Sequence, residues 1–193
     1  MRKIAGVLTL VLSAAAGFCE VVYDYQNQGA VFDGTNRVHV ALSDSGINFM
    51  MTVAGTGGEL NSNIGGLGVG DDQLDGTSEA ITVSFSTAVD FVSIDFGAVG
   101  TTISDGVQLT VGTESPRNLY TGIPGFNGTS KVYTPASVIR LGAGETIVLT
   151  GSSGTSSFDL ERITVMAVPE PATGGLLLLG SLMALMVRRA SRA

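Results

Sequence analysis

The sequence has very few of the residues that build disulfide bonds, zinc sites and catalytic triads. Cys19 is its only cysteine and His39 its only histidine. A single cysteine excludes an intramolecular disulfide, so the body of an exported protein would have to be stable through its core alone. His39 stands between Val38 and Val40 in a strand-like segment and matches no His-rich zinc site and no Ser-His-Asp triad. We therefore expect it to be a surface residue on a strand.

Aromatic and basic residues are also scarce. Tryptophan is absent and aromatic residues make up 6% of the chain, which is lean for a sugar-binding face. The two ends of the chain hold five of the ten basic residues and one of the 17 acidic ones, which leaves 5 basic and 16 acidic residues in the body, a net charge of about −11. Such a body repels nucleic acid and anionic membranes.

The C-terminal segment combines three features in a fixed order. Pro169-Glu170-Pro171 comes first, and its prolines favour extended backbone and exclude helix just before them. An uncharged apolar run follows over residues 172–187, and we expect it to form a C-terminal transmembrane helix. It is a little shorter than the roughly 20 residues that span a bilayer comfortably. The basic tail, residues 188–193, would stay in the cytoplasm by the positive-inside rule, because it carries three arginines, Arg188, Arg189 and Arg192.

This composite of tripeptide, apolar span and basic end resembles the PEP-CTERM sorting signal of exopolysaccharide-producing Gram-negative bacteria. In that family an exosortase, which is a membrane cysteine transpeptidase, reads the tripeptide. The resemblance covers residues 168–193. It implies an exosortase-type partner, a transient anchor in the inner membrane, and delivery to the cell envelope or the extracellular matrix. A plain C-terminal membrane anchor is the alternative, although a short, glycine-containing span fits a processed anchor better.

The N-terminal segment is typical of a secretory signal peptide. Arg2 and Lys3 make the start basic, and residues 4–12 form an apolar stretch. Ala14 and Ala16 then supply the small residues that signal peptidase requires. We expect residues 1–19 to be the signal peptide, which forms a signal helix, with cleavage after Ala16 or after Cys19.

Between these ends, residues 20–168 show alternation of apolar and polar residues with period two and no helical periodicity. This pattern, with its many glycine turns, predicts an all-β domain: a single antiparallel β-sandwich, jelly-roll-like in topology. In the segment after Asp90, alternation places Phe91 on the same face as Asp95. The predicted strands are Glu20–Tyr25, Arg37–Leu42, Ile47–Val53, Glu79–Ser86, Asp90–Ala98, Val107–Val111, Val138–Leu141, Thr146–Thr150 and Phe158–Val168.

The segment 54–78 is rich in glycine, and we expect it to be a long irregular loop. Its acidic end brings four carboxylates within nine residues: Asp71, Asp72, Asp75 and Glu79. Calcium takes six to eight oxygen ligands, so these residues are candidates for a calcium site. The spacing matches neither an EF-hand nor a glycine-rich calcium repeat, and a solvated acidic turn before a strand is the alternative.

Two functions remain open from the sequence. The termini and the lack of catalytic residues favour an exported, non-enzymatic envelope or matrix protein, associated with exopolysaccharide. The alternative is a calcium-assisted, lectin-like carbohydrate-binding module on the cell surface. A small hydrolase would need a cleft lined by two carboxylates, such as Asp71 with Asp72 or Asp90 with Asp95.

Overall fold

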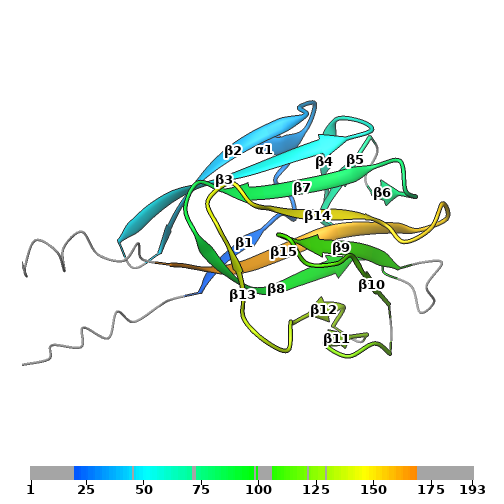
Figure 1. Ribbon diagram of the computed structural model, residues 1–193. Coiled ribbons are helices and arrows are strands. Elements are labelled where there is room, and N and C mark those ends of the chain that lie inside the picture. The colour runs from blue at the N-terminus through cyan, green and yellow to red at the C-terminus, as the bar shows by residue number, and fades with distance from the viewer. Residues whose placement is uncertain are drawn as a thin grey trace, which may run out of the picture.

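The computed structural model describes residues 20–44, 46–70, 73–97, 99, 106–120, 122–128 and 130–168. They form two antiparallel sheets and one four-residue helix, α1 (Gly29–Phe32), so the predicted all-β class is confirmed (Figure 1). The expected signal helix and the apolar span over 172–187 lie outside these residues. Within the described ranges, no helix combines the length and the hydropathy needed to cross a membrane.

The larger sheet, sheet A, has β15 at its centre. Its path is β11 (Phe126–Asn127), β12 (Val132–Tyr133), β8 (Val89–Gly97), β15 (Ser157–Ala167), β5 (Leu67–Val69) and β4 (Leu60–Ser62). Two more strands pair with β15, namely β1 (Val21–Asp24) and β6 (Leu74–Asp75), and β13 (Ile139–Leu141) pairs with β8.

The second sheet, sheet B, has six strands in one continuous order. They are β10 (Arg117–Leu119), β9 (Val107–Val111), β14 (Thr146–Gly151), β7 (Ala80–Phe85), β3 (Ile47–Thr56) and β2 (Arg37–Asp44). All nine strands predicted from alternation are present in the two sheets, with ends shifted by a few residues at most.

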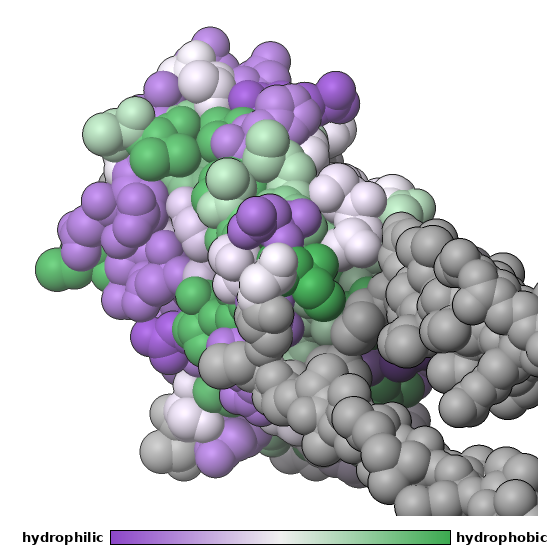
Figure 2. Space-filling view, turned by 90° about the vertical axis from the view of Figure 1, so that its left-hand side faces the viewer, coloured by the Kyte–Doolittle hydropathy of each residue, from purple (hydrophilic) through white to green (hydrophobic). Residues whose placement is uncertain are grey.

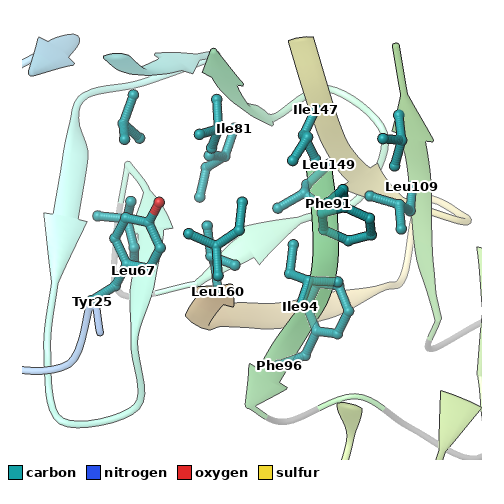
Figure 3. Close-up of a cluster of buried hydrophobic side chains, with 14 of the residues drawn as sticks. Tyr25, Leu67, Ile81, Phe91, Ile94, Phe96, Leu109, Ile147, Leu149 and Leu160 are labelled. Carbon is teal, nitrogen blue, oxygen red and sulfur yellow. The ribbon is translucent and has the colours of Figure 1, made fainter. Parts of the chain in front are cut away.

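The core lies between the two sheets, because each strand turns its apolar face toward the other sheet. In β7, the alternate residues Ile81, Val83 and Phe85 are buried, as predicted from the alternation. Figure 3 shows side chains of both sheets meeting in this core, among them Leu149 of β14 and Leu160 of β15. Burial of this apolar layer is the main stabilising contribution in a chain without disulfides.

The chain crosses from sheet B to sheet A after β7 and again after β14, and the two crossings lie next to each other. Strand β7 pairs with β14 in sheet B, and the strands that follow each of them, β8 and β15, pair with each other in sheet A. Two long segments therefore run side by side across both layers.

The predicted face of Phe91 is wrong. Phe91 is 2% exposed and points into the core with Ile94, although strict alternation would put these two residues on opposite faces. The register between β8 and β15 shifts between Ser93 and Phe91, so Val92 is an extra residue that the partner strand does not match. This β-bulge resets the alternation and moves Phe91 to the buried face.

The expectation of a long irregular loop over 54–78 is also wrong. Strand β3 continues to Thr56, and the rest of the segment contains the short strands β4, β5 and β6. Their leucines, Leu60, Leu67 and Leu74, are completely buried. The segment therefore closes one end of the core instead of extending into solvent.

Candidate functional site

The most informative site is the point where the last strand leaves the body. The N–H of Ala167, the last residue of β15, donates to Oδ2 of Asp44 at 2.9 Å, and this carboxylate is 3% exposed. The N–H of Val168 then donates to the carbonyl oxygen of Ala88 at 2.9 Å. Backbone hydrogen bonding thus continues to the residue that directly precedes Pro169.

Proline has no N–H and cannot continue such a ladder, so Pro169 marks the natural end of the strand. The tripeptide Pro169, Glu170 and Pro171 and the arginines Arg188, Arg189 and Arg192 lie outside the described residues. The structure does establish the distance in sequence: one residue, Val168, separates the end of β15 from the tripeptide. Any partner that reads the tripeptide would meet it close to the body.

The beginning of the body lies at the same end of the sandwich. Val21, the first residue of β1, pairs with Val165 near the end of β15. Figure 1 shows the blue start of β1 and the orange end of β15 on the same side of the molecule. We call this side the exit end and define it by Val21, Asp44, Ala88 and Val168.

Figure 2 views the molecule from the exit end, where hydrophobic and hydrophilic residues alternate over the surface. A shallow, open hollow of about 470 Å³ lies beside it, over β2, β3 and Ser86. Its lining includes Ala41, Ser43, Asn48 and Met50 and contains no carboxylate or histidine. The hollow therefore lacks the carboxylate pair that a glycosidase mechanism needs.

The predicted calcium ligands are only partly described by the structure. Asp71 and Asp72 lie outside the described residues. Asp75 is exposed in β6, and Oε2 of Glu79 accepts the N–H of Asp75 at 2.8 Å. The carboxylate of Glu79 thus binds the backbone of Asp75, four residues earlier in the chain. Among the residues that the structure describes, no three His, Cys, Asp or Glu side chains are placed to hold a metal ion.

The structure also contains a charged cluster that the sequence did not predict. Arg162 of β15 stands directly between Asp24 of β1 and Asp95 of β8 in the sheet register. Its guanidinium donates to Oδ2 of Asp24 at 3.1 Å and to Oδ2 of Asp95 at 3.0 Å. We call these three residues the Arg162 clasp. It joins three neighbouring strands on the outer face of sheet A.

Burial shifts the pKa of two acids at this clasp. Burial raises the pKa of Asp95, and the charge of Asp24 raises it further, while Arg162 opposes both effects. Burial likewise raises the pKa of Glu161, with the charge of Asp95 adding to it and Arg162 and Lys131 opposing. Arg162 therefore only partly offsets the burial of Asp95, whose carboxyl group is harder to ionise than a free one.

The other candidate residues from the sequence, His39, Asp90 and Asp95, contact side chains of neighbouring strands. His39 is exposed on β2, as predicted, and its Nδ1 lies 2.9 Å from Oγ1 of Thr52 on the neighbouring strand. Asp90 forms an ion pair with Arg140 at 2.8 Å, so Asp90 and Asp95 each face their own arginine. The two carboxylates are thus engaged in separate strand-to-strand contacts.

No protein-family model, curated protein or solved structure matches this chain.

Proposed function

We propose that this chain is an exported, non-enzymatic protein of the cell envelope or extracellular matrix, sorted through its C-terminal tripeptide. In this proposal residues 1–19 direct export, and residues 172–187 hold the precursor transiently in the inner membrane. An exosortase-type transpeptidase then reads Pro169-Glu170-Pro171. The acidic β-body associates with exopolysaccharide, and neither catalysis nor nucleic acid has a part in its role.

The observation that carries this proposal is the exit end. Hydrogen bonding at the end of β15 extends to Val168, the residue that directly precedes the tripeptide in the sequence. Because the start of β1 lies at the same end, the signal peptide and the membrane segment would leave the body together. Such a body sits close to the membrane and folds without using its tail.

The experiment that tests this proposal compares two substitutions in the tail. Glu170→Ala removes the charged residue of the tripeptide but leaves the apolar run 172–187 intact, so insertion into the membrane should persist while sorting fails. Thr173→Ala, three residues further on, is the matched control and should sort normally. Cell fractionation and immunoblotting distinguish precursor from sorted protein. Identical fractionation of Glu170→Ala and the control would favour a plain membrane anchor instead.

We further propose that the body is a jelly-roll-like sandwich. The supporting observation is the paired crossing described above, in which β7 and β14 are neighbours in one sheet and their successors β8 and β15 are neighbours in the other. A jelly roll is built from long strand pairs wrapped in this way.

A calcium-assisted carbohydrate-binding module is the second candidate. The observation that favours it is the hydrogen bond from the N–H of Asp75 to the carboxylate of Glu79, which holds these two acidic residues close together. Asp71 and Asp72 belong to the same turn in sequence, and oxygen-rich turns of this kind suit calcium better than the smaller magnesium ion.

Calcium should raise the melting temperature of the body if this second candidate is right. A ligand that binds only the folded state stabilises it by about 2.7 kcal/mol at a hundredfold excess over Kd. Asp72→Ala combined with Asp75→Ala should abolish the shift, and Glu59→Ala, an acidic control outside the turn, should not. A melting temperature that stays constant in millimolar calcium, together with no calcium-dependent signal on a glycan array, would exclude this candidate.

A further inference from the structure

Strand β2 is an unusually long edge in this fold. It contributes eight residues to the margin of sheet B, whereas the other marginal strands, β1, β4, β10, β11 and β13, contain two to four. It pairs with β3 in an uninterrupted register and contains no proline and no bulge. Figure 1 shows it along the upper margin of the molecule. Natural proteins usually shorten, bend or block such edges, because they can pair with other strands.

The hydrogen-bonding groups of alternate β2 residues point away from the sheet. The carbonyl of Asn36 accepts the N–H of Gly55. On the other side of β3, the carbonyl of Met50 accepts the N–H of Ser86, and the N–H of Met50 donates to Oγ of Ser86. Because these directions alternate along a strand, Ala41, opposite Met50, turns its own N–H and C=O outward. The outward-facing set is Arg37, His39, Ala41 and Ser43. In the described part of the chain, β3 is the only strand that pairs with β2.

The side chains of β2 leave an apolar layer incomplete. Val38, Val40 and Leu42 pack against the core but are only partly buried, since sheet B ends at this strand. The side chains between them, Arg37, His39, Ala41 and Ser43, are exposed on the opposite face of the sheet, away from the core. An added strand would cover the partly buried valines and leucine if its own apolar face pointed the same way.

We propose that β2 pairs antiparallel with β2 of a second copy of this chain, about a two-fold axis at Val40. A strand that pairs antiparallel with itself is self-complementary, as a two-fold interface requires. This register places Val40 opposite Val40 and Val38 opposite Leu42, so the apolar layers of both copies become continuous. It also brings the outward-facing backbone groups of the two strands into hydrogen-bonding position, as in His39 opposite Ala41.

Charge favours a second copy as the occupant. The body is strongly acidic, but β2 exposes no carboxylate, because its one acid, Asp44, is buried and holds Ala167. In this register the cationic Arg37 faces the neutral Ser43. The two Arg37 side chains stand at opposite ends of the pair, roughly 20 Å apart along the strands. This inference is independent of the proposed function.

Disulfide trapping tests the register in the full-length chain, kept in mild detergent. In a Cys19→Ser background, Val40→Cys should form a disulfide-linked dimer on oxidation, because directly opposed residues of a non-hydrogen-bonded pair lie close enough for a disulfide. Ser43→Cys, exposed on the same strand but far from its copy in this register, is the matched control and should remain monomeric. Equal trapping at both positions, or none at position 40, would overturn the proposal.

A mass measurement gives an independent readout. Sedimentation of the detergent-solubilised chain should give twice the monomer mass, and Ala41→Pro should give the monomer mass. That proline removes an N–H which points outward, so the β2–β3 ladder stays intact, as unchanged circular dichroism would show. A wild-type chain that sediments as a monomer would overturn the proposal, and so would an Ala41→Pro variant that remains a dimer. Should Ala41→Pro fail to fold, the trapping pair decides.

Discussion

Arg162 shows how single side chains connect strands that are distant in the sequence. Asp24 and Asp95, its two partners, lie 138 and 67 positions away in the sequence. The side chain of Arg162 is 40% exposed, so each ion pair contributes little by itself, about 0–1 kcal/mol. The main effect of the clasp is to fix the positions of β1 and β8 relative to β15, the strand that leads to the tripeptide.

Glu161, next to this clasp, provides a test at the scale of one residue. Its pKa is raised in the folded protein, so its ionised form is less stable there than in the unfolded chain. That penalty is absent below the unfolded pKa of about 4.5 and appears as the pH rises through the higher folded value. Glu161→Gln should therefore be more stable than wild type at pH 7, by about 0.2–1 kcal/mol, since solvent screens a half-buried charge.

Thermal melts of both proteins at pH 7 and pH 4 check this expectation. The gain should disappear at pH 4, where wild-type Glu161 is protonated. Glu59→Gln is the control, because it removes the same charge from an acidic protein at an exposed position. If the control gains as much as Glu161→Gln, the effect comes from net charge and not from the burial of Glu161.

Face assignments from the sequence depend on single residues. Alternation correctly placed Ile81, Val83 and Phe85 inside, because β7 pairs without interruption. The same reasoning failed for Phe91, because the extra residue Val92 is visible only in the pairing with β15. The clasp was missed for the same reason: its three members lie on predicted strands, but the sequence does not say which strands are neighbours.

At the scale of elements, all long strands were predictable, whereas of the strands with two or three residues only β13 was. The nine predicted strands each carry enough alternating residues to show a period. The missed strands, β4, β5, β6, β10, β11 and β12, have two or three residues each and exist because a neighbouring strand pairs with them. The glycine-rich segment that contains β4, β5 and β6 was predicted to be a loop, although its buried leucines, Leu60, Leu67 and Leu74, were the available signal.

Gly66 tests whether this glycine-rich segment is structural. Its φ is +145°, and a Cβ at this position would lie 2.6 Å from the carbonyl oxygen of Leu160 on the central strand. Gly66→Ala should cost about 1–3 kcal/mol of unfolding free energy, because the backbone can neither accept the side chain nor move away. Urea denaturation measures the loss. Gly154→Ala, where a Cβ meets nothing within 4 Å, should be nearly neutral; equal stability of the two variants would mean that segment 54–78 does not pack as described.

At the scale of the whole molecule, the fold places both ends of the body on one side. Pairing of Val21 with Val165 and the hydrogen bond of Val168 to Ala88 create this arrangement. The predicted last strand, Phe158–Val168, ended directly before the tripeptide, and in the structure one residue lies between β15 and the tripeptide. It could not predict that β1 starts beside that exit, because strand order follows from long-range pairing.

The candidate calcium residues illustrate the opposite case. The sequence could group Asp71, Asp72, Asp75 and Glu79 by proximity alone. In the structure the carboxylate of Glu79 binds the backbone of Asp75, a role that spacing does not reveal. A cluster of acids in sequence therefore says less about chemistry than the hydrogen bonds that each carboxylate makes.

Transfer of the tail to another protein tests the central claim most directly. Residues 168–193 would be fused after the last strand of an unrelated exported β-domain, with and without Glu170→Ala, and expressed in the cell that makes this chain. If the tail alone directs sorting, the fusion with the intact tripeptide should fractionate with the envelope or matrix, and the Glu170→Ala fusion should stay in the inner membrane. The same distribution for both fusions would contradict the account.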